Sequence, residues 1–368
     1  MKFGISRTLI LLLLSHLVCV RALFLQDEEA NNITNMTHNG TKKPRVFVVV
    51  VQTHATQGWC RLILSAKLCN VEIATIEMGG LYSHVKRPRW VMEFLEKQNA
   101  SDEDIVIHLD GSDIIVSDGE KYENAVEYFM QNTAENKEKF SGEDTVKEKH
   151  ISPIMFMTTS ECYAPQLDLL MNSDHKEHVQ RCYWFFNVGY RKEEDKKLPH
   201  LLKSPPSGKP YLSGGGLIAR VWAFKKFEYA FGELLKGSEE WWSEQSIYKP
   251  LLIWSAIQEE AVGQRFVLKR GMIGLDYEEI FFTIPSSGVI GEAPFIHFPG
   301  QPIAWEEKAR LIVKNISWYK RLKGREFNSK DMGKIETYLV GGEKLHFDYE
   351  RICGDAFKEG DLFRAKKL

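Results

Sequence analysis

The stretch Val46–Val51 constrains the fold of this chain more than any other part of its sequence. It reads VFVVVV, a continuous apolar run of strand length in which no polar residue alternates. A strand without alternation is typical of burial on both faces, which is the position of strands in a parallel sheet covered by helices. The sequence therefore predicts an α/β fold with this strand inside the sheet.

The segments that follow this run alternate between helix and strand patterns. Apolar residues recur at roughly helical spacing over 57–71, and 71–80 has the composition of a strand and a turn. Residues 87–101 again indicate a helix, and 104–116 indicate a strand that runs into an acidic turn. This alternation predicts right-handed crossovers and a Rossmann-like, mostly parallel sheet flanked by helices.

The remainder of the chain divides into a charged stretch, further elements of the folded domain and a basic end. Residues 131–150 are highly charged and are expected to form a solvated loop or an exposed helix, and 152–158 indicate another buried strand. Residues 210–231 read as a short strand that passes through three glycines into a helix. We expect one folded domain over 44–300 and an amphipathic C-terminal extension over 301–368.

The N-terminus has the pattern of a signal peptide. Two basic residues precede an apolar run that is too short to span a bilayer comfortably, and Val20 and Ala22 place small residues before a cleavage site. Residues 1–22 are therefore predicted to direct the chain into the secretory pathway, to the lumen of the endoplasmic reticulum or Golgi, the cell surface or secretion. An uncleaved signal anchor is the alternative, disfavoured by His16 within the run, and no other transmembrane helix is expected.

The polar residues after the signal agree with secretion. Residues 23–43 are rich in Asn and Thr, a composition typical of an unstructured stem. Sequons for N-glycosylation occur at Asn32, Asn35, Asn39, Asn99 and Asn315. Three of them fall within eight residues of the stem, which is hard to attribute to chance. We predict a glycosylated stem.

Composition and cysteine count narrow the class of protein. A chain of 368 residues with 43% hydrophobic residues can bury a sizeable core, and a net charge of −2 argues against a nucleic-acid partner. Six cysteines become five if Cys19 leaves with the signal, so at least one then lies outside any intramolecular disulfide. Cys162 and Cys182 are a candidate pair, although spacing alone leaves the connectivity open.

Two carboxylates follow the strand that ends at Leu109. Asp110 and Asp113 lie in the stretch LDGSDIIV, where a parallel strand would deliver them to the carboxyl edge of the sheet, the usual place for ligands. Hard cations such as Mn²⁺ and Mg²⁺ prefer oxygen ligands, and Mn²⁺ also accepts imidazole. The pattern favours a metal site, and a solvated turn beside Gly111 is the alternative.

Three further features contain residues that could contact a ligand or a substrate. Gly214 to Gly216 would let a ligand approach the backbone closely, or would form a flexible loop. His297 ends a short apolar strand, so the same sheet edge as that of the two aspartates could bring it near them, although a lone histidine is more often structural. Glu244 could hydrogen-bond a hydroxylated substrate, or lie on the surface of a helix.

Taken in order, these stretches resemble the glycosyltransferase domain of the procollagen-lysine hydroxylase/glycosyltransferase family, which has a GT-A fold. The chain is also similar to the trypanosome expression-site-associated gene three products, which share that domain. The resemblance covers roughly residues 45–300. No single motif is highly specific, and their common order carries the resemblance.

Individual positions match the motifs of the family. A V-A-T segment and a G-[FY]-x-R-[FL] helix start are matched by Val51, Gln52, Thr53, Gly58, Trp59 and Arg61. The D-x-x-D, Y-L-N-S-G-G-F, D-D-Q and H-G-N-G-P motifs are matched by Asp110 with Asp113, YLSGGGL, SEQ and HFPGQP. The resemblance implies that Asp110, Asp113 and His297 hold Mn²⁺ against the diphosphate of a UDP-sugar. It also implies that Thr53 contacts the nucleoside and that Gly214 and Gly215 line the sugar pocket.

The sequence departs from the family pattern at three places that bear on nucleotide and acceptor handling. The acidic residue after the V-A-T segment is Ala55, the aspartates of D-D-Q are Ser243 and Glu244, and the asparagine before the glycines is Ser213.

The expected function is transfer of a sugar from a UDP-sugar to a protein or glycan acceptor in a Mn²⁺-dependent reaction, with Glu244 orienting the sugar or the acceptor. A non-catalytic secreted or surface glycoprotein that keeps the fold as a binding module is the main alternative, and the altered SEQ segment favours it. A glycoside hydrolase is disfavoured, because it needs two opposed carboxylates rather than two on one turn.

Overall fold

The computed structural model describes residues 43–171, 174–203, 208–260, 262–263, 265–285, 291–300, 311–319 and 332–353. The predicted signal peptide, nearly all of the predicted stem and the sequons at Asn32, Asn35 and Asn39 lie outside these ranges. The chain divides into two units after Pro44, and every helix and strand described belongs to the second, which begins at Arg45. Within the described ranges, no helix combines the length and the apolar character needed to cross a membrane.

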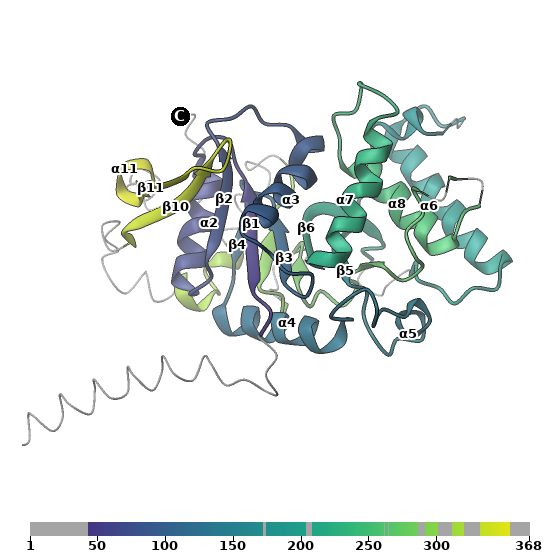
Figure 1. Ribbon diagram of the computed structural model, residues 1–368, viewed down its shortest axis with the longest axis horizontal. Helices are drawn as coiled ribbons and strands as arrows, with labels where there is room; N and C mark the ends of the chain where they lie inside the picture. Colours follow the sequence, from purple (N-terminus) through teal and green to yellow (C-terminus); the bar gives the residue numbers. More distant parts are fainter. Residues whose placement is uncertain are drawn as a thin grey trace, which may run out of the picture. The chain divides into compact units, whose positions relative to one another are not determined.

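An eight-stranded sheet forms the centre of this unit (Figure 1). Its order is β11-β10-β2-β1-β3-β6-β5-β7. The strands span β1 Val46–Val51, β2 Ile73–Met78, β3 Ile105–Leu109, β5 Ile154–Thr159, β6 Tyr211–Arg220, β7 Ile273–Leu275, β10 Lys334–Leu339 and β11 Lys344–Asp348. Strand β1 pairs in parallel with β2 and β3, whereas β6 runs antiparallel to both of its neighbours. The predicted class, an α/β fold with a mostly parallel sheet flanked by helices, is confirmed.

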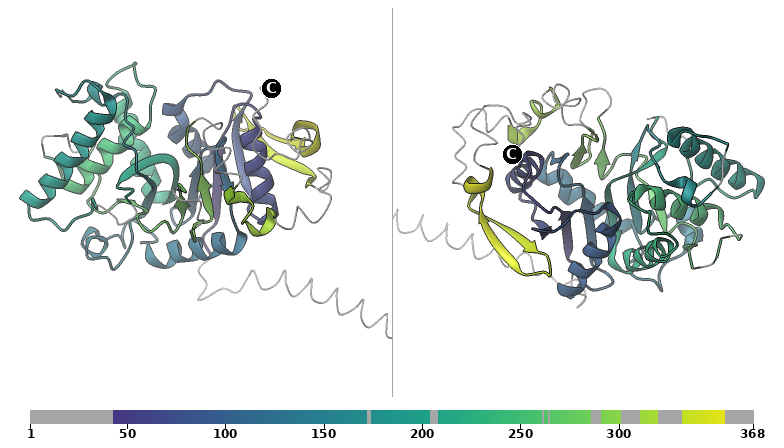
Figure 2. Two further views of the ribbon diagram at one scale, coloured as in Figure 1. Left: turned by 180° about the vertical axis from the view of Figure 1, so that it is seen from behind. Right: turned by 90° about the horizontal axis from the view of Figure 1, so that it is seen from above.

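The valine run of β1 packs into hydrophobic cores on both faces of the sheet, which explains why apolar and polar residues do not alternate in it. Val49 and Val51 pack with α3 and α7, while Val48 and Val50 pack with α2 and α4 on the opposite face. The helices span α2 Gln57–Leu68, α3 Arg87–Lys97, α4 Gly119–Asn132, α5 Gly142–Val146, α6 His178–Asp195, α7 Val221–Leu235, α8 Gln245–Ile257 and α11 Tyr349–Cys353. Short 3₁₀ turns occur at η1 His84–Lys86 and η2 Leu167–Leu169. Figure 2 shows helices on both sides of the sheet.

The three glycines at 214–216 lie inside a strand, so the prediction of a short strand that gives way to glycines before a helix is wrong. Strand β6 continues through them for ten residues, and α7 starts directly after it. Both edges of β6 are paired, to β3 and to β5, and these ladders outweigh the low strand propensity of glycine. The absence of side chains at these positions lets other elements pack closely on β6.

A second, three-stranded sheet has the order β4-β9-β8 and spans Ile114–Val116, Phe295–His297 and Phe282–Thr283. Strand β4 follows the acidic turn at once, and it pairs antiparallel with β9, with Ile114 opposite His297. The expectation that His297 shares a sheet edge with the strand before Asp110 is therefore wrong. The chain leaves the large sheet at Leu109 and enters the small one at Ile114. Pairing of β4 with β9 in the small sheet then brings His297 to the acidic turn.

The C-terminal extension joins the large sheet rather than standing apart from it. Strand β10 pairs in parallel with β2, and β11 completes a hairpin with β10 (Figure 1). A disulfide between Cys60 and Cys353 ties α2 to α11, and a second one joins Cys162 to Cys182. Cys69 is buried in the thiol form. Two intramolecular disulfides and one thiol thus account for the five cysteines that follow the predicted signal.

Candidate metal centre

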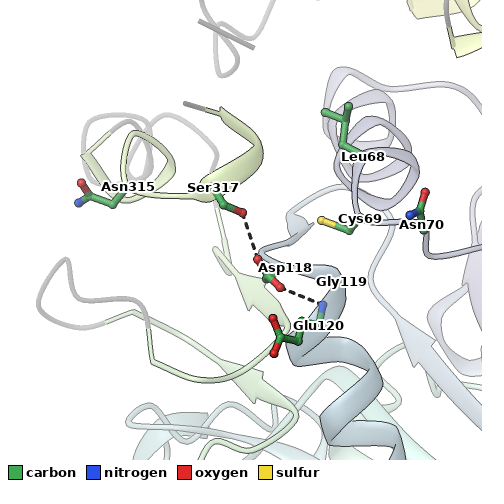
Figure 3. Close-up of a pocket in the computed structure, with 8 residues that line it drawn as sticks. All are labelled: Leu68, Cys69, Asn70, Asp118, Gly119, Glu120, Asn315 and Ser317. Atoms are coloured by element: carbon green, nitrogen blue, oxygen red, sulfur yellow. Dashed lines mark hydrogen bonds between the residues drawn. The ribbon is translucent and has the colours of Figure 1, made fainter. Parts of the chain in front are cut away.

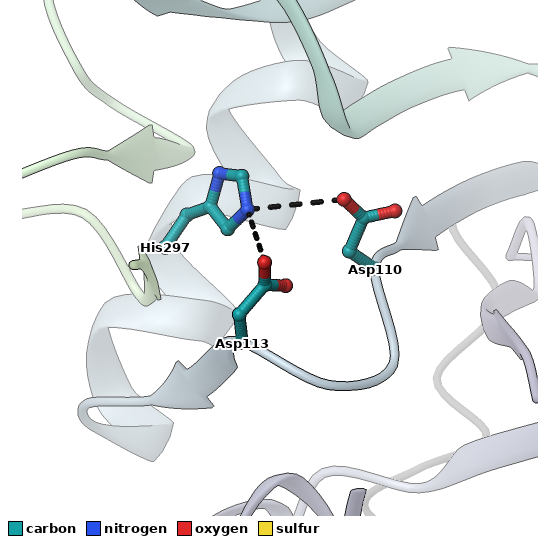
Figure 4. Close-up of side chains that lie close together, drawn as sticks. All are labelled: Asp110, Asp113 and His297. Atoms are coloured by element: carbon teal, nitrogen blue, oxygen red, sulfur yellow. Dashed lines mark ion pairs between the residues drawn. The ribbon is translucent and has the colours of Figure 1, made fainter. Parts of the chain in front are cut away.

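Asp110, Asp113 and His297 come together at the end of β3 (Figure 4). One ligand atom from each side chain lies within 4.8 Å of the others. His297 Nε2 is 3.3 Å from Asp113 Oδ2 and 3.8 Å from Asp110 Oδ2. We refer to these three side chains as the triad. Their tips point toward one another across the turn, as Figure 4 shows.

Backbone contacts fix the relative positions of the triad residues. The amide of Asp110 donates to the carbonyl of Gly215 at 2.9 Å, which ties the turn to β6. The amide of Phe298 donates to the carbonyl of Asp113 at 2.8 Å, beside the pairing of Ile114 with His297. Strands of both sheets thus hold the backbone at the three triad residues.

Glycines bring the elements around the triad into close contact. A Cβ at Gly215 would lie 2.3 Å from Cε1 of His297, so only glycine leaves room for this imidazole. A Cβ at Gly58 would lie 1.6 Å from the carbonyl oxygen of Ser112, so the start of α2 packs directly on the acidic turn. Gly214 faces Gln245 in the same way, because a Cβ at this glycine would lie 2.7 Å from Cγ of Gln245. Both glycines that the resemblance places in the sugar pocket thus have a protein side chain beside the position that a Cβ would occupy.

Several buried polar atoms of the triad have no hydrogen-bond partner within the described part of the chain. They are both ring nitrogens of His297 and Oδ1 of Asp113. The imidazole is only 3% exposed, whereas the carboxylates of Asp110 and Asp113 are 27% and 20% exposed. Burying such atoms without partners costs free energy, and a bound cation would remove this cost. Two carboxylates and one imidazole are a ligand set that suits Mn²⁺, and the exposed sides of the carboxylates leave room for further oxygen ligands.

Protonation of the triad follows from burial and from neighbouring charges. Burial raises the pKa of Asp110, but Arg87 and His297 outweigh this effect and lower it below its usual range. Burial lowers the pKa of His297, but the carboxylates of Asp113 and Asp110 raise it above its ordinary value. A histidine that gains a proton here cannot bind a metal, so acid and cation compete for this site.

Arg87 lies on the other side of Asp110 and was not identified from the sequence. It begins α3, is 2% exposed, and its Nη2 contacts Oδ1 of Asp110. Its Nη1 donates to Oε1 of Glu244 at 3.1 Å, and its Nη2 lies 3.3 Å from Nε2 of His108. Burial and Arg87 lower the pKa of His108 to about 3, so this imidazole is neutral.

Glu244 is buried rather than placed on a helix surface. It precedes α8, and its two oxygens have separate partners: Oε1 accepts from Arg87, and Oε2 lies 3.3 Å from Nδ1 of His84. The ring of Tyr82 packs edge-on against His84. We call Arg87, Glu244, His84 and His108 the arginine cluster. It joins the segment before α3 to the start of α8.

The other predicted site residues that the structure describes, Thr53, Asn99 and Asn315, belong to neither the triad nor the arginine cluster. Thr53 follows β1, is buried, and its hydroxyl lies 3.2 Å from Nδ1 of His54. Asn99 and Asn315 are exposed, as glycan acceptors must be.

Asn315 and Ser317 line a hollow of about 670 Å³ between the end of α2 and the start of α4 (Figure 3). In this hollow Asp118 accepts from Ser317 and from the amide of Glu120, so its carboxylate caps α4.

Comparison with known protein families found no family that matches this chain, and comparison with curated proteins found no match either.

Proposed function

We propose that the chain is a glycosyltransferase of GT-A type that uses a UDP-sugar and Mn²⁺. The observation that carries this proposal is the triad, in which two carboxylates and a buried imidazole converge while three of their polar atoms lack hydrogen-bond partners among the described residues. Buried polar atoms in proteins are usually hydrogen-bonded, so three unpartnered atoms gathered at one place favour a bound cation. The order of motifs that resembles the procollagen-lysine hydroxylase/glycosyltransferase family supports the same function.

Each residue would have a defined task in this reaction. Asp110, Asp113 and His297 would hold the cation, which when bound offsets the negative charge of the leaving nucleoside diphosphate. Gly215 admits the His297 ring, and pairing of β4 with β9 holds this ring against Asp113. Both oxygens of Glu244 are engaged, so it suits orientation of a sugar or acceptor hydroxyl better than removal of a proton.

We place this activity in the secretory pathway, with a protein or glycan as acceptor. The signal-like N-terminus and the stem sequons motivate this assignment. Two intramolecular disulfides and the exposed sequons at Asn99 and Asn315 are compatible with it.

A binding module that keeps the fold without catalysis is the second candidate. The observation in its favour is the engagement of both Glu244 oxygens, which leaves this residue without a free base. A glycoside hydrolase has less support, because Asp110 and Asp113 face the same imidazole instead of opposing each other across a substrate.

The decisive experiment measures Mn²⁺ binding and UDP binding by calorimetry, together with a screen for UDP-sugar hydrolysis with and without Mn²⁺. Asp113→Asn should weaken Mn²⁺ binding by at least roughly 100-fold, because replacing even an outer partner of a metal ligand commonly costs 10–100-fold. It should abolish the Mn²⁺-dependent part of UDP binding. Asp168→Asn, at an exposed aspartate paired with Arg181, is the matched control and should bind as the wild type does.

The outcomes separate the candidates. Mn²⁺-dependent UDP binding with turnover of a UDP-sugar supports the transferase, and the same binding without turnover of any UDP-sugar supports the binding module. Equal UDP affinity in the wild type and Asp113→Asn would remove the basis of the proposal.

A further inference from the structure

Arg87 is a buried charge that the proposed reaction does not use directly. Its guanidinium contacts Asp110, directly after β3, and Glu244, directly before α8, and it lies beside His108. None of these three residues belongs to α3. Burying an arginine is costly even when it is paired, and apolar replacement of buried ion pairs is often neutral or stabilising. Stability alone is therefore a weak reason for this arrangement.

The two oxygens of Asp110 are divided between Arg87 and the triad. Oδ1 contacts Nη2 of Arg87, and Oδ2 faces Nε2 of His297 at 3.8 Å. A carboxylate with one oxygen held in this way cannot turn freely about its terminal bond. Its second oxygen is then directed to the point where the triad converges.

Arg87 brings a permanent positive charge to a group of three carboxylates. Asp110 and Glu244 contact its guanidinium, and Asp113 lies across His297 from Asp110. Removing Arg87 would release Oδ1 of Asp110. The negative charge left behind would by itself attract a cation, so a loss of cation affinity reports the orientation of Asp110 and not the change in charge.

We propose that Arg87 is a positioning residue that directs Oδ2 of Asp110 toward a divalent cation and is itself held by Glu244. Cation affinity then depends on an arginine that does not touch the cation. This inference rests on the proposed metal site but not on the identity of the sugar or of the acceptor. It also gives Glu244 a second task, because this residue links the start of α8 to the metal site.

The test titrates the purified protein with Mn²⁺ alone and records binding by calorimetry and by the electron paramagnetic resonance spectrum of the bound ion. Arg87→Met should weaken Mn²⁺ binding by about 10–100-fold, the usual cost of losing a group that orients a metal ligand. Arg87→Lys should recover part of this loss, because an ammonium group can still donate to a carboxylate but cannot reproduce the two-pronged contact with Asp110 and Glu244. Arg89→Met, at an exposed arginine on the same helix, is the matched control and should not change binding.

A thermal unfolding curve of each variant shows whether it is folded. If Arg87→Met does not fold, Arg87→Lys and Glu244→Gln decide the question, because both keep a hydrogen-bonding group at the position that they change. Each should weaken Mn²⁺ binding by a few-fold and alter the spectrum of the bound ion. Wild-type affinity in folded Arg87→Met, or in both conservative variants, overturns the inference while leaving the metal site intact. A wild-type protein that does not bind Mn²⁺ overturns the metal site and the inference together.

Discussion

Asp110 belongs to the triad and contacts the arginine cluster, and these two clusters are built differently. On one side it faces the triad, where both ring nitrogens of His297 and one oxygen of Asp113 lack hydrogen-bond partners among the described residues. On the other side it contacts the arginine cluster, where both oxygens of Glu244 and both terminal nitrogens of Arg87 have partners. Nε of Arg87 is the atom of this cluster that lacks a partner among the described residues, against three atoms of the triad. The triad requires something more.

This difference separates a structural role from a binding role. A buried charge network in which most polar atoms have partners holds elements together, here the start of α3, the end of β3 and the start of α8. Polar atoms that are buried without partners are retained at a cost in stability, and such costs are concentrated at functional sites. Removing a residue from the arginine cluster should therefore lower stability, whereas removing one from the triad should lower cation binding.

The largest expected effect is on the stability of the metal-free protein. Glu244→Ala leaves Arg87 buried with one carboxylate fewer, and removing one partner of a buried ion pair typically costs about 3–5 kcal/mol. Asp113→Ala should cost less, because Oδ1 of Asp113 has no partner to lose among the described residues. Its Oδ2 lies 3.3 Å from Nε2 of His297, but Asp110 still faces this imidazole when Asp113 is removed. Urea unfolding in the presence of a chelator measures both values. The reverse order would show that the triad is the structural cluster.

The next effect compares two neighbouring glycines of β6. Gly215→Ala places a methyl group against the rigid ring of His297, so we expect Mn²⁺ affinity to fall by at least roughly 100-fold. Gly214→Ala meets the flexible side chain of Gln245, and we expect a change below about threefold. Mn²⁺ calorimetry on the two folded variants gives the comparison.

A double mutant provides the control for this pair. With His297→Ala in place, the methyl group of Gly215→Ala has room, so the destabilisation caused by this substitution should shrink. Neighbouring residues of this kind are commonly coupled by about 0.5–3 kcal/mol. Equal losses of Mn²⁺ affinity in the two glycine variants, or additive stability effects in the double mutant, would contradict the contact between Gly215 and His297.

Local pattern was sufficient to predict part of the site. The valine run, the acidic turn after Leu109 and the histidine at the end of an apolar strand are all visible in short stretches of sequence. Their convergence was expected, because ligand sites in α/β sheets gather at strand ends. The route was wrong, since the small sheet that carries His297 depends on β4, only three residues long, and such a short strand gives little signal in sequence.

The arginine cluster could not be predicted in this way. Arg87 stands at the start of an amphipathic helix, where arginine is common on the surface, and its burial depends on Glu244, 157 residues away. His108 was the signal available, because a histidine inside an apolar strand two residues before Asp110 indicates a buried partner. The glycines of β6 were misread for a related reason: their strand is imposed by two neighbouring strands and not by their own propensity.

The last effect is confined to alkaline pH and concerns Lys249, which lies in α8 near Glu244. This lysine is fully buried, and its Nζ donates to the carbonyl of Tyr163 at 2.8 Å and lies 3.3 Å from Oε1 of Gln245. Burial lowers the pKa of Lys249 to about 7, and the nearby charge of Glu244 opposes this shift only in part. The folded protein therefore binds fewer protons at Lys249 than the unfolded chain does between pH 7 and the ordinary lysine value of 10.5.

Stability contributed by Lys249 should rise with pH across this window and stay level below about pH 7, because the unfolded state binds more protons within the window. Its slope cannot exceed about 1.4 kcal/mol per pH unit for one proton. We expect the difference in unfolding free energy between the wild type and Lys249→Met to grow in favour of the wild type from about pH 7 to about pH 9.5, measured by urea unfolding at constant salt. Lys225→Met, at an exposed lysine paired with Asp102, is the matched control and should follow the wild-type curve. Parallel curves for the wild type and Lys249→Met would show that Lys249 keeps its proton when buried, and that Glu244 has a buried lysine charge near it as well as that of Arg87.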